Sequence, residues 1–409
     1  MPDNTRPLLD PAQRAEFQRL NRTKAICCLP YFDDAPKEAL IQFDYLSKGA
    51  ANVVYTIHRA EKPFTNAFLF VHVQDQGSSA TAISNDQVID RVLRVPRGRA
   101  KHLTSDDIVA GFEQAVRPVF LSGKVDAVGS GENLENSEDE QVQVPVEPDQ
   151  DLSKYLMDLK RVAFLPGVMA HLAHLAHFTE PGTFEQGVDN SGLLLPDMSP
   201  VPDVSISLEI KPKWLLQSPT APASAVRCRT CAMQVAIPKH REIYLCPLRL
   251  VYGTQPDLRD WAWYVLADHF GGTADVSKDT QKQVMVSRLV RRLIDYLVVG
   301  DGRTLLLHIQ YLESKLDPQG ILKREQVHPN DVFDRNSRLA MTLRDSSWFI
   351  MIPFAVNAPI TSKLGDLDFK SGEKLVDWAD KELMLLQSEM YTKVVADGPE
   401  CWLGRTDKA

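Results

Sequence analysis

Two lysines two residues apart are the first side chains whose spacing could do chemistry. Lys211 and Lys213 flank Pro212 in the segment EIKPK, which follows an alternating run that predicts a strand through Ile210. Alternate residues of an extended chain project to one side, about 7 Å apart, and the proline restricts the backbone between them. Two ammonium groups on one face suit a polyanion. Two solvated lysines at the exit of a strand account for the segment equally well.

A run of small residues lies between two strand-like segments early in the chain. It contains Gly49, Ala50, Ala51, Asn52 and Val53. Small side chains let a backbone approach an anion closely, as loops that cover phosphates require. The run has a single glycine, so it is neither a Walker loop nor a dinucleotide-binding fingerprint. By itself, it predicts an ordinary hairpin turn.

A lone aspartate precedes an apolar, strand-like run much later in the chain. Asp345 stands in the segment LRDSSWFI, a position where an aspartate most often forms a turn. Next to a phosphoryl donor, its carboxylate could instead orient or deprotonate an attacking hydroxyl.

The segment GDLDFKSGEKLVDW combines carboxylates with basic residues. Asp366 and Asp368 alternate, and carboxylate oxygens are the hard donors that suit magnesium bound with nucleotide phosphates. Lys370, Lys374 and Trp378 follow at four-residue intervals, so with Asp366 they form one stripe if the segment is helical. A solvated helix start with an aspartate as its cap is the alternative.

The six cysteines do not form the pattern of a disulfide scaffold. Cys228 and Cys231 make a CxxC pair, but no second CxxC follows. Cys246 and His240 complete a zinc site only if the fold happens to bring them together. We therefore expect free thiols, as in a reducing compartment.

Composition excludes several classes of protein. The 409 residues include 46 Lys and Arg against 54 Asp and Glu, a net charge of −8, so a global attraction to nucleic acid or to an anionic membrane is not expected. An anionic ligand must then be held by a local basic pocket. The N-terminal segment is polar, and the longest clean apolar run, residues 162–170, is interrupted by Pro166 and is far shorter than the roughly 20 residues of a membrane span. We expect a cytoplasmic or nuclear protein.

The elements that must position these residues divide into two parts. We predict an α+β fold with a β-rich N-terminal lobe (residues 1–190), a hinge (191–203) and a larger mixed lobe (204–409). Residues 126–151 are acidic and poor in large apolar groups, which predicts a disordered insertion. The remaining predicted elements are strands near 53–60, 67–74 and 91–96, a helix over 155–178 broken near Pro166, helices after 255, a β region over 338–356 and a helix over 372–394.

Taken together and in this order, GAANVV, EIKPK, RDSSWFI and GDLDFK resemble the inositol-pentakisphosphate 2-kinase family. The segment RCRTCAMQ, residues 227–234, strengthens the EIKPK match, and the resemblance extends over about residues 44–380. The acidic insertion makes the chain more similar to fungal than to plant members. The resemblance implies a two-lobed inositol polyphosphate kinase-like fold with the active site in the cleft. It implies transfer of a phosphoryl group from ATP, with Mg2+, to the 2-hydroxyl of inositol 1,3,4,5,6-pentakisphosphate, giving inositol hexakisphosphate (phytate).

The resemblance also implies roles for single residues. Lys211 would contact the transferring phosphate, Asp345 would accept the proton of the hydroxyl, and Asp366 would bind magnesium. The nucleotide would be held by Gly49, Ala50, Ala51, Asn52, Val53, Arg94, Leu195 and Asp197. The inositol phosphate would be held by Arg97, Arg99, Lys213, Lys239, Lys370, Lys374 and Trp378.

The chain departs from the family pattern at several positions. Met233 stands where the family has a histidine, and the basic residue shortly beyond it could be Lys239 or His240. The resemblance matches a further arginine of the first lobe to Arg117. The zinc-binding cluster of plant members has no counterpart that we can identify, so we expect no structural zinc.

Three further readings stay open at the level of sequence. One is an inositol phosphate kinase of another position specificity, one is a pseudokinase that binds inositol phosphates as a scaffold, and one is a two-lobed protein of another role. Retention of Lys211, Asp345 and Asp366 argues against the pseudokinase, because a binding protein needs the basic pocket but not the base. We expect a monomer without nucleic acid or membrane partners.

Overall fold

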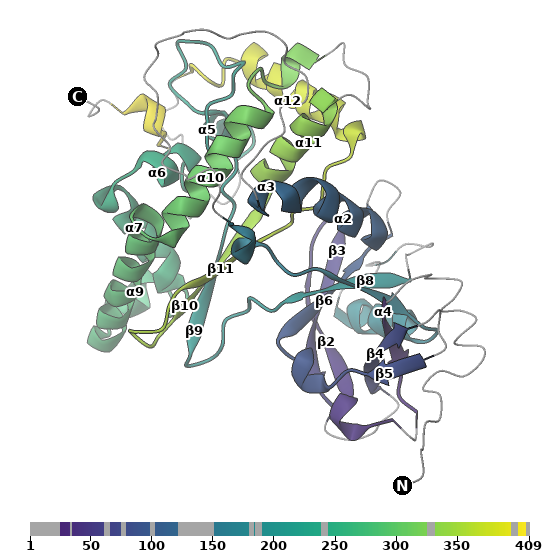
Figure 1. Ribbon diagram of the computed structural model, residues 1–409. Helices are drawn as coiled ribbons and strands as arrows, with labels where there is room; N and C mark the ends of the chain where they lie inside the picture. The colour runs from purple at the N-terminus through teal and green to yellow at the C-terminus, as the bar shows by residue number, and fades with distance from the viewer. Residues whose placement is uncertain are drawn as a thin grey trace. The chain divides into compact units, whose positions relative to one another are not determined.

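The computed structural model describes residues 25–32, 35–60, 66–74, 79–98, 103–121, 151–179, 184, 190–238, 244–324, 332–393 and 400–405 (Figure 1). The chain divides into two compact units. Unit 1 comprises Met1–Gly111 and Met157–Asp197, and unit 2 comprises Phe112–Leu156 and Met198–Ala409. Both strands and helices are abundant, which confirms the α+β class.

Unit 1 is built on an eight-stranded sheet in the order β1-β7-β8-β6-β3-β2-β4-β5. Strand β1 also pairs with β4 over six residues, so the sheet closes on itself. Strands β1 and β7 run parallel, and the other pairs are antiparallel. The strands are β1 (Ala25–Pro30), β2 (Ile41–Lys48), β3 (Asn52–Arg59), β4 (Phe68–Gln74), β5 (Ser79–Ala82), β6 (Arg91–Pro96), β7 (Lys160–Phe164) and β8 (Ser191–Pro196).

One helix covers the core of this sheet. Alternate residues of β2 and β3, such as Phe43, Val53 and Tyr55, are buried, as the period of two in these strands predicts. They pack with residues of α4 (Val168–Thr179) in one hydrophobic cluster, and the Tyr55 hydroxyl donates to the Leu172 carbonyl at 2.8 Å. Helix α2 (Ser105–Gly111) contacts β7 and β8.

Unit 2 contains a three-stranded antiparallel sheet in the order β11-β10-β9. Helix α9 lies beside it: Tyr296 stacks near Trp348 at 6.0 Å between ring centroids and is hydrogen-bonded to Ser362 at 2.7 Å (Figure 1). The elements are η4 (Phe112–Val116), α3 (Arg117–Leu121), η5 (Ser153–Tyr155), β9 (Ser205–Ile210), α5 (Arg229–Ala236), α6 (Pro247–Tyr252), α7 (Gln255–Asp268), α8 (Thr273–Val276), α9 (Thr280–Val298), α10 (Asp301–Leu316), α11 (Val332–Arg344), β10 (Ser347–Pro353), β11 (Thr361–Gly365), η8 (Gly372–Lys374), α12 (Leu375–Gln387) and η9 (Trp402–Gly404).

Helix α9 shows why the sequence after residue 255 is helical. Its apolar residues recur at the 3.6-residue period, and Val286, Leu289, Leu293 and Leu297 are all fully buried. The Asp279 side chain caps the first turn by accepting from the backbone N–H groups of residues 281 and 282, at 2.9 and 3.1 Å.

Two predicted elements are wrong in part. The region 155–178 is not one broken helix, because residues 160–164 form strand β7, which pairs with both β1 and β8; the helix begins only after Gly167. The region 338–356 is not all β, because residues 338–344 complete helix α11. Leu339, Ala340 and Leu343 are buried there at helical spacing. The acidic segment 126–151 lies outside the described residues except for its last one.

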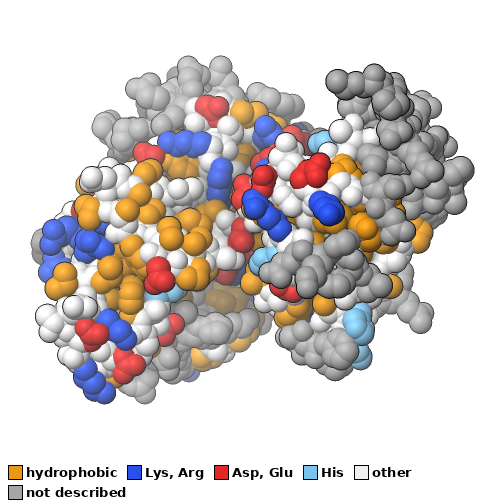
Figure 2. Space-filling view, turned by 90° about the horizontal axis from the view of Figure 1, so that it is seen from below, with side chains coloured by type: hydrophobic (Ala, Val, Ile, Leu, Met, Phe, Trp, Pro, Cys, Tyr) orange, Lys and Arg blue, Asp and Glu red, His pale blue; other side chains and the backbone are white. Residues whose placement is uncertain are grey.

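The described surface carries mixed charge. Lys and Arg side chains are interspersed with Asp and Glu on the face drawn in Figure 2, as the net charge of −8 leads one to expect. Within the described ranges, no helix combines the length and the apolar character that crossing a membrane requires.

We expect Gly192→Ala to destabilise unit 1. A Cβ on Gly192 of β8 would lie 2.7 Å from Phe164 Cζ and 2.9 Å from the Arg94 carbonyl oxygen. Overpacking of this kind costs about 1–3 kcal/mol, measurable by denaturant unfolding. Gly49→Ala is the matched control, because its Cβ would meet nothing closer than the Asn52 carbonyl oxygen at 3.8 Å. Equal stability of the two variants would contradict the packing described for β8.

Candidate active site

Three segments far apart in the sequence meet at one edge of the β11-β10-β9 sheet. Strand β9 ends at Ile210, β10 begins at Ser347, and β11 ends at Gly365. In the antiparallel register Ile210 pairs with Trp348, and Gly365 pairs with Ser347. The residues that follow β9 and β11 and those that precede β10 are therefore neighbours. These are the segments EIKPK, RDSS and GDLDFK.

The Ser347 hydroxyl is the centre of the first cluster of side chains at this edge. Ser347 Oγ accepts from Lys211 Nζ at 2.6 Å. It lies 2.7 Å from Glu209 Oε1 and 2.8 Å from Asp366 Oδ2, and its single proton can be donated to one of them at a time. Lys211 Nζ also lies 3.2 Å from Glu209 and 3.3 Å from Asp366. Burial alone would lower the pKa of Lys211. The nearby carboxylates of Asp366 and Glu209 outweigh burial, so the pKa of Lys211 lies above its ordinary value.

We call this set of Glu209, Lys211, Ser347 and Asp366 the acidic cluster. It holds two carboxylates and one ammonium, so it carries one net negative charge. Carboxylate and hydroxyl oxygens in such proximity are the donors that magnesium prefers, so the donor set fits that ion. Sequence reasoning selected Lys211 and Asp366 but missed Glu209 and Ser347. Glu209 could have been found, because alternation places it on the same face of the strand as Lys211.

A second cluster surrounds Asp345. Its Oδ1 accepts from Lys213 Nζ at 2.9 Å, and its Oδ2 accepts from Lys370 Nζ at 2.7 Å. Burial raises the pKa of this carboxyl, but Lys370 and Lys213 outweigh burial and lower it to about 2. This basic cluster has two ammonium groups and one carboxylate, hence one net positive charge. The edge of the sheet therefore carries two neighbouring clusters of opposite net charge, the acidic cluster and the basic cluster.

Two of these residues have backbones in the left-handed region. Lys213 has φ 58° and Asp366 has φ 53°. A non-glycine residue there is uncommon, and for a long side chain such as lysine it persists only where the surroundings enforce it. The chain after Ile210 therefore turns, so Lys211 and Lys213 do not project as the simple alternation of an extended strand.

Buried contacts beneath the basic cluster hold the turn at Lys213. Trp214, which follows Lys213, has the guanidinium of Arg344 at 3.6 Å from its ring centroid, and Arg344 immediately precedes Asp345. Arg344 is buried and pairs with Glu313 at 3.4 Å and with Asp317. Glu313 also accepts from the Leu215 N–H. The neighbours of both Lys213 and Asp345 are thus fixed to one buried ion-pair network.

The four-residue spacing of Asp366, Lys370, Lys374 and Trp378 predicted one stripe on a helix, and this prediction is wrong. Helix α12 begins only at Leu375, and residues 366–371 are irregular. Of the predicted stripe, Lys370 joins the basic cluster, Lys374 is exposed in η8, and Trp378 is 8% exposed. The indole packs in a hydrophobic cluster with Trp214.

The predicted phosphate-covering loop belongs to unit 1, where it joins β2 to β3. The Gly49 N–H donates to the Asn52 carbonyl at 2.9 Å, which closes a tight turn, and Gly49 and Ala50 are exposed. Val53 is fully buried in the sheet core, so the loop offers its backbone rather than this side chain. The Ala51 carbonyl accepts from the Arg97 N–H at 2.9 Å.

Two arginines of the β6 region hold this loop. Arg97 is 5% exposed and donates from Nη1 to the carbonyls of Gly49 and Ala50, at 3.3 Å each. Arg94 is 6% exposed, and when the Asn52 amide oxygen faces it, that oxygen accepts from Nε and Nη2 at 3.1 Å each. Both predicted arginines therefore lie against the loop.

The other predicted residues are placed less centrally or lie outside the described ranges. Leu195 pairs with Val92 in the sheet, and the Asp197 N–H donates to the Asp90 carbonyl at 2.8 Å. Arg117 forms an exposed ion pair with Glu113 on α3 and η4. Arg99, Lys239 and His240 lie outside the described residues.

Comparison with known proteins agrees with these segments. The family model described as inositol-pentakisphosphate 2-kinase matches residues 45–383, which include the residues of both clusters and the whole loop of residues 49–53. The chain belongs to the inositol-pentakisphosphate 2-kinase family. A protein of Yarrowia lipolytica named inositol-pentakisphosphate 2-kinase is 33% identical over 200 residues, which are 49% of this chain and 57% of that protein. The aligned segment thus spans little more than half of the relative's length. That relative is fungal, in agreement with the resemblance seen in the sequence.

The buried network makes a pH-dependent prediction. Burial raises the pKa of the Glu313 carboxyl to about 7, although Arg344 opposes this. The folded protein then binds more protons than the unfolded chain between the ordinary value of 4.5 and 7, so stability falls as pH rises through this range. Glu313→Gln removes the titration. We expect its free energy of unfolding, relative to the parent protein, to rise by about 1–3 kcal/mol between pH 5 and 8.

Glu382→Gln is the matched control for this measurement. Glu382 is equally buried, but Arg229 and three hydroxyl donors outweigh burial and lower its pKa. It is therefore ionised throughout pH 5–8, and its variant should differ from the parent protein by a constant amount. A constant difference for Glu313→Gln would show that Glu313 is ionised as well.

Proposed function

We propose that this protein transfers a phosphoryl group from ATP to the 2-hydroxyl of inositol 1,3,4,5,6-pentakisphosphate, giving inositol hexakisphosphate. The observation that carries the proposal is the placement of the Asp345 carboxylate between the ammonium groups of Lys213 and Lys370, beside the acidic cluster. Family membership and the relative named inositol-pentakisphosphate 2-kinase support it. So does the excess of positive charge around Asp345, because five phosphate groups demand cationic partners.

The basic cluster suggests how the acceptor becomes reactive. Without substrate, Lys213 and Lys370 are paired with Asp345 and hold its pKa near 2. A phosphate-rich acceptor competes for both ammonium groups. As they turn to the phosphates, the pKa of Asp345 rises and its carboxylate becomes a better acceptor for the hydroxyl proton. Asp345 then orients the hydroxyl and takes its proton as the bond to phosphorus forms.

The acidic cluster suits the donor side of the reaction. Glu209 and Asp366 would hold magnesium, which neutralises charge on the nucleotide phosphates when bound. Lys211, now paired with these carboxylates, would contact the transferring phosphate. Lys374 would add to the acceptor site, and Arg97 and Arg94 would keep the loop of residues 49–53 in the shape that receives the ATP phosphates.

The proposal includes a two-lobed kinase-like arrangement in which unit 1 supplies the nucleotide loop and unit 2 supplies both clusters. Leu195 and Asp197 would then lie beside the adenine, and Arg99, Lys239 and Trp378 would extend the inositol phosphate site. A monomer in the cytoplasm or nucleus, without nucleic acid or membrane partners, remains the expectation from composition.

A different position specificity is the main alternative, since the two clusters do not by themselves select one hydroxyl. A scaffold that binds inositol phosphates without turnover is less well supported. Such a protein would keep the lysines but has no need of Asp345 between them or of two carboxylates on one serine.

Phosphorus NMR tests the reaction and the base together. Purified protein is incubated with inositol 1,3,4,5,6-pentakisphosphate, ATP and magnesium, and a new phosphate at the axial 2-position is expected. Asp345→Asn should lower kcat by about 10²–10⁴-fold, because the proton acceptor is lost. Substrate binding should be retained or tightened, because two ammonium groups lose their competing carboxylate.

Asp377→Asn is the control. Asp377 is 53% exposed, close to the 51% of Asp345, and it is also paired with a lysine, but its described ion pair is with Lys381 of the same helix and with no member of either cluster. Its kcat should be unchanged. Binding without turnover in the parent protein would favour the scaffold, and phosphorylation of another hydroxyl would favour the other specificity.

A further inference from the structure

The end of α11 and the residue after it hold Lys370 at three separate points. Thr342 Oγ1 accepts from the Lys370 N–H at 3.1 Å, and Arg338 Nε donates to the Lys370 carbonyl at 2.6 Å. The third contact is the ion pair of 2.7 Å between Asp345 and the Lys370 ammonium group. The backbone N–H, the backbone carbonyl and the side chain of one residue are therefore all bound to one short stretch of chain.

Helical spacing explains why these three residues reach the same partner. Positions 338, 342 and 345 are separated by four and then three residues, which places them on one face of a helix. Asp345 directly follows α11, and its N–H still donates to the Thr342 carbonyl at 3.2 Å. The base of the proposed reaction and the two residues that hold the backbone of Lys370 are thus fixed to one another by one helix.

The Thr342 hydroxyl is fully buried, and its partners determine its orientation. It donates its single proton to the Arg338 carbonyl at 2.7 Å, so its oxygen is left to accept from the Lys370 N–H. A threonine inside a helix commonly donates to the carbonyl four residues back. The contact with Lys370 joins two segments and is not required for the helix to form.

Arg338 contacts the same segment in two ways. Its guanidinium lies 4.3 Å from the centroid of the Phe369 ring, and its Nε donates to the carbonyl of Lys370. Residues 366–371 have no regular secondary structure, so their backbone groups need partners from elsewhere in the chain. Thr342 and Arg338 supply these partners at Lys370.

We propose that Thr342 and Arg338 are positioning residues for phosphoryl transfer. They hold the backbone of Lys370 while its ammonium group moves from Asp345 to a phosphate of the acceptor. This inference rests on the proposed function, in which the substrate competes for that ammonium group. The two backbone contacts do not depend on the ion pair, so the segment keeps its place when the pair opens. The lysine then stays within one side-chain length of the base, and the acceptor is held where its hydroxyl can react.

Thr342→Val tests the proposal, because valine keeps the shape of threonine and removes the hydroxyl. We expect the KM for inositol 1,3,4,5,6-pentakisphosphate to rise about 2- to 10-fold, since binding must then order the segment. Thr342→Ser, which retains the hydroxyl, should restore the KM. In a Lys370→Met background, Thr342→Val should change the KM no further, because it acts through Lys370.

Ser205→Ala is the matched control. Ser205 is buried, and its hydroxyl also accepts from a backbone N–H, that of Val201 at 3.3 Å, but it lies at the opposite end of β9 from Lys211. This variant should lower stability without changing the KM. The proposal is overturned if Thr342→Val lowers stability alone, or if it raises the KM equally in the Lys370→Met background.

Hydrogen exchange separates this inference from the proposed function. The Lys370 amide should exchange faster in Thr342→Val than in the parent protein, whether or not substrate is turned over. If the parent protein does not phosphorylate the pentakisphosphate, the proposed function fails, and calorimetry then measures its affinity for the same compound. Weaker binding by Thr342→Val would support the positioning role. Equal affinity, or unchanged exchange of the Lys370 amide, would overturn it.

Discussion

Mutual repulsion of lysines is the constraint on which this site depends. The proposed substrate has five phosphates, so a protein of net charge −8 must gather ammonium groups in one place to bind it, and without the substrate these groups repel one another. Carboxylates offset this repulsion. Asp345 lies between Lys213 and Lys370, and Lys211 is paired with Glu209 and Asp366. Each carboxylate is both a temporary counter-ion and a group that the proposed reaction uses.

This arrangement depends on the register of a small sheet. Because β10 is antiparallel to both neighbours, its first residue lies beside the last residues of β9 and β11. A slip of one residue would turn Ser347 to the opposite face and separate the carboxylates from Lys211. The buried Arg344, Glu313 and Trp214 hold the adjoining turn at Lys213, which has a left-handed backbone. Interior ion pairs thus determine the geometry of an exposed site.

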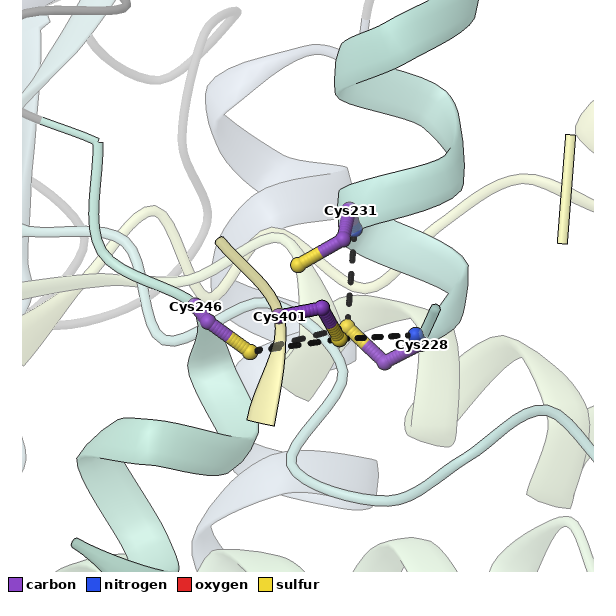
Figure 3. Close-up of side chains that lie close together, drawn as sticks. All are labelled: Cys228, Cys231, Cys246 and Cys401. Atoms are coloured by element: carbon purple, nitrogen blue, oxygen red, sulfur yellow. Dashed lines mark hydrogen bonds between the residues drawn. The ribbon is translucent and has the colours of Figure 1, made fainter. Parts of the chain in front are cut away.

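Local patterns in the sequence predicted single strands and helices, but they could not predict contacts between segments that are far apart in the chain. The alternation of β9 up to Ile210 and the apolar stripe of α9 are patterns within single elements, so both could be predicted from the sequence. Strand β7 was mistaken for helix because its partners, β1 and β8, are distant in sequence. The same reason hid Ser347 and the convergence of four buried cysteines, Cys228, Cys231, Cys246 and Cys401, whose sulfur atoms lie within 4.8 Å of one another (Figure 3). Cys246 and Cys401 are 155 residues apart, and no local pattern indicates that they meet. The family resemblance assigned Arg97 to the inositol phosphate, and its described hydrogen bonds go to loop carbonyls.

The order of the four cysteines has a consequence for how the chain is made. Cys228 leaves the ribosome 173 residues before Cys401. At 5–20 residues per second this interval lasts roughly 10–35 seconds. During that time the thiols of Cys228, Cys231 and Cys246 are present without that of Cys401 and are open to oxidation. Final packing of this part of the protein must therefore await the synthesis of Cys401, whatever has already folded upstream.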